Sequence, residues 1–187
     1  MSSVTDVARS TSAALSASLA ARLHTARAEI ELRAERKDDL DFMRGIYAAV
    51  RADELALTDW PDERKKLFTD SQFDLQHAHY QAHYPGAEFL VVLCGGEPVG
   101  RLYLCVLKTE IRVMDIALTQ ALRGRGIGSA LMAALIEEGR MRGLALTLHV
   151  EPLNPAQRLY RRLGFQLIER RGVYDFLGWS PEGRRIS

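Results

Sequence analysis

The spacing of hydrophobic and polar residues divides the chain into short stretches that alternate and longer stretches of helical period. Residues 30–35 place Ile30 and Leu32 on one side and charged residues on the other, which predicts a strand with one buried face. Apolar residues then recur at helical spacing up to about residue 52. A second helical stretch, residues 62–83, is expected to be broken near residues 69–71.

The rest of the chain changes between the two patterns, with glycine, proline or asparagine at the boundaries. The expected elements are strands over residues 88–94, 99–107 and 111–118, a helix over 126–142, a strand over 144–150, a helix begun by Asn154, and strands over 165–169 and 173–179. This order predicts a mixed α/β domain around one twisted sheet. Its first half is expected to be antiparallel, and a right-handed parallel strand–helix–strand crossover is expected behind it.

Composition and charge narrow the functional classes. The chain has 187 residues, enough for one domain with a small-molecule cleft. Its formal net charge is +1, which argues against a dedicated nucleic-acid binder, and no apolar run is long enough to span a membrane. Cys94 and Cys105 form neither a metal spacing nor a disulfide framework, so we expect reduced thiols and a cytoplasmic protein.

The N-terminal segment permits two interpretations. It is rich in Ser, Ala and Arg and has a single acidic residue, a composition also found in organellar targeting segments. Alternatively, Leu15, Leu19 and Leu23 recur at helical spacing and indicate an amphipathic helix. We therefore expect residues 1–27 to be an N-terminal extension, helical or disordered, and residues 28–187 to form the functional domain.

A turn rich in glycine and arginine carries the strongest chemical signal. It reads Leu122-Arg123-Gly124-Arg125-Gly126-Ile127-Gly128-Ser129, and it lies between a predicted strand and a predicted helix. Glycines let backbone N–H groups approach a ligand, and the open N–H groups and dipole at a helix start favour phosphate. The spacing fits neither a Walker A loop nor the Rossmann fingerprint, whose third glycine would fall at Ser129. A plain helix start needs fewer glycines and arginines, so we expect a phosphate or pyrophosphate ligand here.

Within this turn, Arg123-x-x-Gly126-x-Gly128 resembles the pyrophosphate-binding loop of the GNAT superfamily of N-acetyltransferases. The similarity extends over about residues 99–179 through three more motifs: Asp115-Ile116-Ala117-Leu118, Asn154-Pro155-Ala156, and Leu159-Tyr160-Arg161-Arg162-Leu163-Gly164-Phe165. One departure is Gln120, where many members carry proline. The resemblance implies a GNAT-like single domain with a coenzyme A cleft and acetyl-CoA as cosubstrate, without a metal.

The resemblance also implies roles for individual residues. A primary amine would attack the thioester directly in a ternary complex, with the Leu118 backbone N–H stabilising the oxyanion and Tyr160 acting as general acid. The alternative for Tyr160 is a tyrosine that only packs in the core. The residues expected to bind the cofactor are Ile116, Ala117, Leu118, Arg123, Gly124, Arg125, Gly126, Ile127, Gly128, Ser129, Asn154 and Arg161.

The proton acceptor and the acetyl acceptor stay open at this stage. Asp115 is one candidate base, from its place on the strand before the turn; Glu110, Glu151 and a chain of waters are the others. The acetyl acceptor is expected to be an amine of a small molecule or peptide, contacted by residues of the early helical region. Those residues are Gln76, His77, Tyr80 and Tyr84.

Two other functional classes compete with the enzyme. A non-catalytic, regulatory coenzyme A-binding module would keep the glycine turn but need no acid, so the motif around Tyr160 favours an enzyme. A kinase would need a Walker lysine and a Mg²⁺-binding hydroxyl, which this turn lacks. His79 and His83 have i, i+4 spacing without further metal ligands, so a polar helix face is expected there. A homodimer fits the sequence, but no feature sets the oligomeric state.

Overall fold

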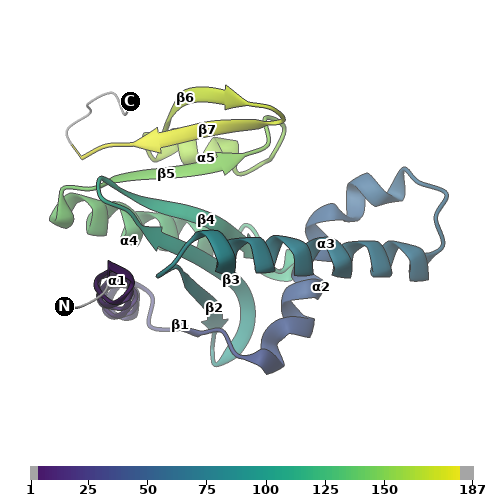
Figure 1. The fold of residues 1–187 in the computed structure, drawn as a ribbon, viewed down its shortest axis with the longest axis horizontal. Helices are drawn as coiled ribbons and strands as arrows, with labels where there is room; N and C mark the ends of the chain where they lie inside the picture. Colours follow the sequence, from purple (N-terminus) through teal and green to yellow (C-terminus); the bar gives the residue numbers. More distant parts are fainter. Residues whose placement is uncertain (1–3, 182–187) are drawn as a thin grey trace.

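A computed structural model describes residues 4–181, which fold around one seven-stranded sheet that runs through the centre of the domain (Figure 1). The strands are β1 (Ile30–Ala34), β2 (Glu88–Cys94), β3 (Glu97–Val106), β4 (Glu110–Leu118), β5 (Ala145–Val150), β6 (Gln166–Arg171) and β7 (Tyr174–Trp179). The helices are α1 (Val4–Ala26), α2 (Leu40–Ala56), α3 (Asp62–His83), α4 (Ile127–Arg142) and α5 (Gln157–Arg162), with 3₁₀ turns η1 (Lys37–Asp39) and η2 (Gln120–Leu122). Of these described helices, none combines the length and apolar character that a membrane crossing requires.

The strand order confirms the predicted topology. In the sheet the strands follow the order β1-β2-β3-β4-β5-β7-β6. Antiparallel pairing joins β1 through β4, and β4 then pairs in parallel with β5 across the α4 crossover. β7 lies antiparallel to both β5 and β6. The mixed α/β sheet and the parallel strand–helix–strand unit were therefore both predicted correctly.

The predicted break within residues 69–71 is wrong, because α3 is continuous. Thr69 is buried, and its hydroxyl donates to the backbone carbonyls of Lys65 (3.1 Å) and Lys66 (3.0 Å). This bonding satisfies the side chain inside the helix, so a residue of low helix propensity does not end it. The preceding helix, α2, also extends beyond the predicted end to Ala56.

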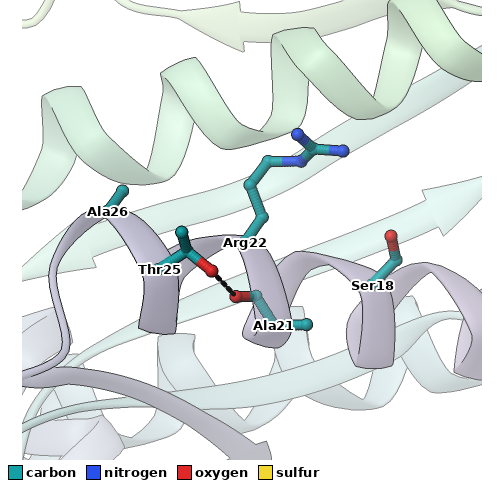
Figure 2. Close-up of a pocket in the computed structure, with 5 residues that line it drawn as sticks. All are labelled: Ser18, Ala21, Arg22, Thr25 and Ala26. Atoms are coloured by element: carbon teal, nitrogen blue, oxygen red, sulfur yellow. Dashed lines mark hydrogen bonds between the residues drawn. The ribbon is translucent and has the colours of Figure 1, made fainter.

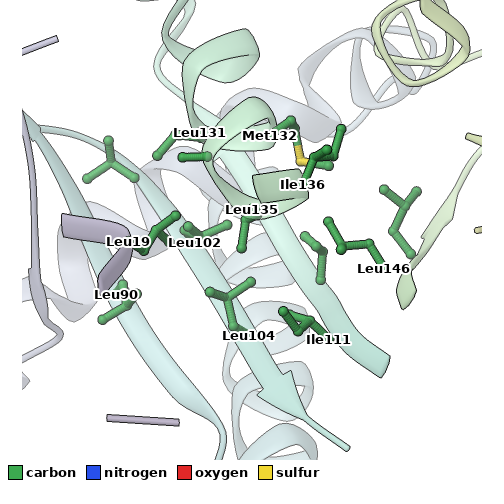
Figure 3. Close-up of a cluster of buried hydrophobic side chains, with 14 of the residues drawn as sticks. Leu19, Leu90, Leu102, Leu104, Ile111, Leu131, Met132, Leu135, Ile136 and Leu146 are labelled. Atoms are coloured by element: carbon green, nitrogen blue, oxygen red, sulfur yellow. The ribbon is translucent and has the colours of Figure 1, made fainter. Parts of the chain in front are cut away.

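The main core lies between the sheet and two helices on one of its faces, α1 and α4. Leu19 from α1 and Leu135 from α4 are both fully buried, and they meet the strand residues Leu102 and Leu104 (Figure 3). Leu15 and Leu23, one turn before and after Leu19, are fully buried too. Where the sequence left helix and disorder open, the structure therefore has a helix whose leucine stripe completes the core.

A buried carboxylate connects α1 to α4. Glu138 of α4 is fully buried and accepts hydrogen bonds from Ser18 (2.7 Å), Arg22 (3.3 Å) and Arg142 (3.1 Å). Arg22 reaches across from α1 beside a shallow groove of about 430 Å³ (Figure 2). Burial would raise the pKa of Glu138, but these hydrogen bonds hold that pKa below its usual value.

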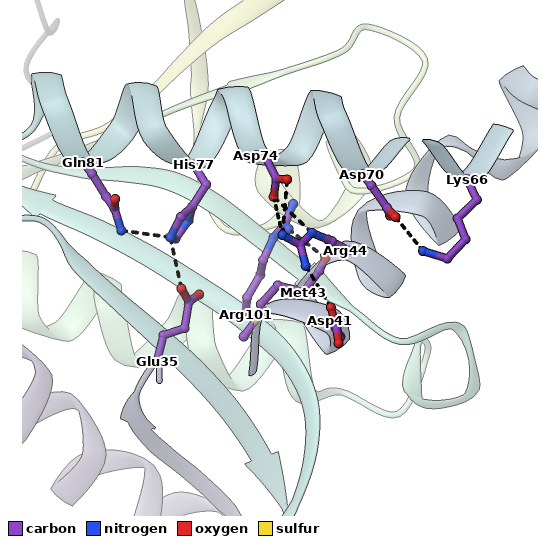
Figure 4. A network of polar contacts seen from close by, with 10 residues as sticks. All are labelled: Glu35, Asp41, Met43, Arg44, Lys66, Asp70, Asp74, His77, Gln81 and Arg101. Atoms are coloured by element: carbon purple, nitrogen blue, oxygen red, sulfur yellow. Dashed lines mark hydrogen bonds and ion pairs between the residues drawn. The ribbon is translucent and has the colours of Figure 1, made fainter. Parts of the chain in front are cut away.

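The opposite face of the sheet is covered by α2 and α3. Phe73 and Met43 pack there against Val91, whereas Val92, the next residue of β2, faces the α1–α4 side. An ion pair also joins the two helices: Arg44 of α2 contacts Asp74 of α3, and it contacts Asp41 within its own helix (Figure 4). The two cysteines, Cys94 and Cys105, are both free.

Candidate functional site

A cleft of about 1100 Å³ opens where β4 and β5 separate. Its walls come from α2, α3, the second half of β4, the turn that begins α4, the end of β5, and α5. The volume is slightly above the range typical of small-molecule sites, about 300–1000 Å³. The cleft therefore has room for a large cosubstrate together with a second reactant.

The cleft exists because β4 leaves its neighbour halfway along its length. Parallel pairing runs only from Glu110↔Ala145 to Val113↔Leu148. On the other side of β4, the register against β3 shifts between Tyr103 and Leu104, which leaves a bulge at Met114. Residues 115–118 thus pair with β3 along one edge and present the other edge to the cleft.

The backbone of Leu118 faces that open edge. Thr119 donates its N–H to the Val99 carbonyl (2.8 Å), toward β3. Because backbone groups alternate in direction along a strand, Leu118 and Ile116 turn their N–H and C=O groups the other way, into the cleft. The Leu118 carbonyl indeed accepts a hydrogen bond from Arg123 Nε there (3.1 Å). The Leu118 N–H is therefore placed to act as a donor inside the cleft.

Two glycines with positive φ shape the turn between β4 and α4. Gly124 has φ +76° and Gly126 has φ +83°. Residues that carry a Cβ rarely adopt this backbone conformation. Gly126 caps α4, and its carbonyl accepts the first helical hydrogen bond, from Ala130 (2.9 Å). The N–H groups of the first helical turn are then open for an anion.

The structure brings most of the turn to the cleft. Arg123, Gly124, Gly126, Gly128 and Ser129 all line it, as do Ile116, Ala117 and Leu118 of β4. Arg125 and Ile127, which the sequence also assigned to cofactor binding, are not among the lining residues. The Ile127 side chain is 2% exposed and belongs to the core, so only its backbone is available to a ligand.

The α5 segment contributes Asn154 and Tyr160. Asn154 Oδ1 accepts a hydrogen bond from the Ala156 N–H (2.9 Å), which holds the turn before the helix. Tyr160 lines the cleft but is only 5% exposed. Burial, with the negative charge of Asp115, raises the pKa of Tyr160 to about 12.

The sequence assigned Arg161 to cofactor binding, but Arg161 is not among the residues that line the cleft. Its Nε donates to the Gln157 carbonyl (3.4 Å) in the preceding turn, whereas Arg158 and Arg162 line the cleft. Residues four apart share a helix face, and Arg161 points about 100° away from Arg162. Arg162 also contacts the glycine turn, donating to the Ser129 hydroxyl (3.3 Å).

An ion pair that sequence reasoning missed lies at the other end of the cleft. Asp115, from β4, accepts a hydrogen bond from the Arg101 guanidinium at 2.8 Å. Arg101 is 3% exposed, donates to the Met43 carbonyl (3.3 Å) and lies against the rings of Tyr47 and Phe73. The only signal in the sequence is a lone arginine in an apolar strand, which by itself does not identify a partner.

The three carboxylates considered as bases are placed differently. Asp115 and Glu151 line the cleft, and Glu151 is paired with Arg51 (3.0 Å). Glu110 is bonded to Arg112 and is not among the lining residues. Asp115 therefore shares the cleft with Tyr160, and its negative charge contributes to the raised pKa of Tyr160.

The predicted acceptor-side residues, in α3 and at its C-terminal cap Tyr84, separate into two groups. Gln76, Tyr80 and Tyr84, spaced by four residues, line the cleft, and the Tyr80 hydroxyl donates to the Met114 carbonyl (3.3 Å). His77 instead faces the sheet, where it lies 3.2 Å from a Glu35 carboxylate oxygen (Figure 4). Within residues 4–181 there is no group of three or more His, Cys, Asp or Glu side chains that could hold a metal ion.

Comparison with known proteins identifies a family to which this chain is similar. Residues 49–165 match the family model described as the acetyltransferase (GNAT) family. No curated protein matches the chain at a significant level. The matched segment contains the second half of α2, all of α3 and the whole cleft-forming region from β2 to α5.

Solved structures with the same fold include several acetyltransferases. The PaiA N-acetyltransferase of Thermoplasma acidophilum, in complex with coenzyme A, has a TM-score of 0.61 at 14% identity over 81% of this chain and 98% of its own. RimL, a ribosomal L7/L12 α-N-protein acetyltransferase in complex with coenzyme A, has a TM-score of 0.55 at 18% identity, over 83% and 96%. Naa50 of Arabidopsis thaliana, bound to the bisubstrate analogue CoA-Ac-MVNAL, has a TM-score of 0.54 at 15% identity, over 81% and 99%.

Proposed function

Because the chain belongs to the GNAT acetyltransferase family, we propose that it transfers the acetyl group of acetyl-CoA to a primary amine of a small molecule or peptide. One observation carries the proposal. The open edge of β4, the glycine turn before α4 and Tyr160 all line one cleft. A thioester, its leaving sulfur and an attacking amine need these three elements in one place.

The residues present suit a coenzyme A ligand. The pyrophosphate fits the turn, where Gly124 and Gly126 expose backbone N–H groups and Arg123 adds a cation. The pantetheine arm carries amides that can pair with the free edge of β4 at Ile116 and Leu118, as an added strand would. When bound, acetyl-CoA supplies the thioester whose acetyl group is transferred.

Leu118 and Tyr160 serve the two atoms at which charge develops. As the amine nitrogen bonds to the carbonyl carbon, the carbonyl oxygen becomes an oxyanion, and the Leu118 N–H is the donor that stabilises it. As the carbon–sulfur bond then breaks, Tyr160 donates to the departing thiolate. A pKa of about 12 keeps the Tyr160 hydroxyl protonated at neutral pH, as a donor must be.

That same pKa limits how Tyr160 acts. An ordinary thiol has a pKa of about 8.5, which is about 3.5 pK units below that of Tyr160, so full proton transfer from Tyr160 to a solvated thiolate is unfavourable. Burial in the cleft raises the basicity of the sulfur as well, which narrows this gap. We therefore assign Tyr160 the role of a hydrogen-bond donor that becomes a proton donor as the thiolate forms.

Asp115 is the carboxylate that we assign to the attacking amine. It lines the same cleft as Tyr160, and Arg101 fixes its orientation, so its carboxylate can accept a hydrogen bond or a proton from the acceptor amine. The amine loses its proton to Asp115 or to a water beside it. Glu151, with its own partner Arg51, is the second candidate.

Turnover by the wild type separates this proposal from a non-catalytic coenzyme A-binding module. The enzyme is mixed with acetyl-CoA and a panel of amines that includes polyamines, amino acids and short peptides, and free thiol release and acetylated product are followed. Release that depends on the amine and drops in Tyr160→Phe supports the transferase. Tight acetyl-CoA binding without release across the panel favours the module, and absence of binding by folded protein refutes both.

A further inference from the structure

The C-terminal end of α1 lies close to the glycine turn that precedes α4. The Arg27 N–H donates to the Leu23 carbonyl (2.7 Å), and the Ile30 N–H donates to the Arg27 carbonyl (2.9 Å) before β1 begins. Leu23 and Ile30 are both buried in the main core. Arg27 therefore stands in a short link that is anchored on both sides, which fixes its backbone position.

The Arg27 guanidinium lies against the glycine that caps α4. A Cβ built on Gly126 would lie 3.3 Å from Arg27 Nη1. Gly126 is the residue at which the open N–H groups of α4 begin. A positive charge from the N-terminal segment is thus adjacent to the backbone donors expected to hold the pyrophosphate.

The outer edge of this guanidinium is available to a ligand. Arg27 Nε donates to Glu29 Oε1 at 2.6 Å, and the side chain is 38% exposed. Within the described part of the chain, Arg27 Nη1 and Nη2 have no hydrogen-bond partner. Glu29 therefore orients the guanidinium and leaves its terminal nitrogens for an anion.

The arginines of the turn leave room for this cation. Arg123 uses its Nε on the Leu118 carbonyl. Neither Arg125 nor Arg27 is among the residues that line the cleft, but Arg27 Nη1 lies against Gly126, which does line it. A pyrophosphate and a further phosphate carry several negative charges, which one arginine and a set of N–H groups balance only in part. Arg27 comes from outside the turn and still reaches the capping glycine.

We propose that Arg27 is a phosphate-binding residue of the acetyl-CoA site, in which its Nη groups bind a phosphate oxygen of coenzyme A beside the start of α4. The inference rests on the proposed function. The family match begins at residue 49, so Arg27 lies outside the segment that defines the family. The phosphate is either one of the pyrophosphate pair or the one on the ribose, and the experiment distinguishes these two.

The test is calorimetric titration of the full-length protein with coenzyme A and with dephospho-coenzyme A. Arg27→Gln is compared with wild type and with Arg64→Gln, a control that removes the same charge from the exposed start of α3. We expect the Kd for coenzyme A to rise about five- to thirtyfold in Arg27→Gln, the loss of one charge-assisted hydrogen bond in a partly exposed site. Arg64→Gln should stay within about twofold, and Arg27→Lys should recover part of the affinity.

The two ligands identify the phosphate. If Arg27 binds the pyrophosphate, Arg27→Gln weakens both ligands by the same factor. If it binds the ribose phosphate, only coenzyme A is weakened, and the variant no longer distinguishes the two ligands as wild type does. In both cases the circular dichroism of the variant should match wild type, because Arg27 is only partly buried and Gln can occupy its place.

The inference and the proposed function fail differently. Wild-type binding that Arg27→Gln retains within about twofold overturns the role of Arg27 and leaves the acetyltransferase proposal standing. The role of Arg27 is equally overturned if Arg64→Gln weakens binding as much as Arg27→Gln, since the effect would then be one of overall charge. Folded wild type that binds neither ligand overturns both.

Discussion

Replacing Leu19 by alanine tests whether α1 is part of the folded core. The Leu19 side chain has 0% exposure and packs among sheet residues and α4. Truncating a fully buried leucine removes its contacts and leaves a cavity, which costs about 2–5 kcal/mol. For a chain of this size each kcal/mol lowers Tm by about 2–4 °C, so a cost of about 3 kcal/mol predicts a drop of roughly 6–12 °C.

The measurements are thermal unfolding, which gives Tm, and urea unfolding, both followed by circular dichroism, with Leu57→Ala as the matched control. Leu57 follows α2 and is 89% exposed, so the same substitution there should change the free energy of unfolding by less than about 0.5 kcal/mol. The slope of free energy against urea reports the surface exposed on unfolding. A single transition with an unchanged slope would show that α1 unfolds together with the sheet.

Two results would refute this reasoning. Equal stabilities of Leu19→Ala and Leu57→Ala would mean that α1 is not docked in solution, whatever its contacts in the structure. The second result is a separate transition at low urea that shifts in Leu19→Ala while the main transition does not. It would mean that α1 unfolds as its own unit and that the rest of the domain is stable without it.

Three further outcomes follow from the same contacts. Tyr160→Phe should lower kcat about 100-fold with little change in the KM for acetyl-CoA, and the wild-type rate should not fall through ionisation of this group below about pH 11, both read from steady-state pH profiles. Glu138 has a lowered pKa, so its stabilisation is complete above its ordinary value of 4.5 and is lost as pH falls through the folded pKa; urea unfolding should show the gap between wild type and Glu138→Gln closing at acid pH. Arg101→Met, which leaves Asp115 unpaired, should destabilise by about 3 kcal/mol in urea unfolding, and adding Asp115→Asn should recover much of that.

The elements that form the sheet could be predicted because their signals are local. The alternation in residues 30–35 and the apolar runs of the later strands correspond to β1 to β7, and the glycines around Gly126 correspond to the turn with positive φ. The error at residues 69–71 arose because a threonine can satisfy its hydroxyl on a helical carbonyl, which its low propensity does not reveal.

The remaining parts of the site depend on packing between distant segments. Arg101 of β3 and Asp115 of β4 lie on neighbouring strands. Their pairing depends on the register of these two strands, including the bulge at Met114. The choice of Arg162 over Arg161 depends on how a short helix is rotated about its axis. Neither quantity has a period or motif that a single sequence displays.

The contact between the end of α1 and the glycine turn has an electrostatic consequence that favours a cation at position 27. The C-terminal end of a helix carries about half a negative charge, and its effect is strongest within the last turn. α1 ends at Ala26, and the next residue reaches Gly126, so this negative end lies near the place where a phosphate is expected. Left alone, it would oppose the favourable dipole of α4. Arg27, which is paired with Glu29 through Nε and lies against Gly126 through Nη1, brings a guanidinium to this place. It can therefore stabilise the end of α1 and reduce the repulsion that α1 would otherwise exert on the ligand.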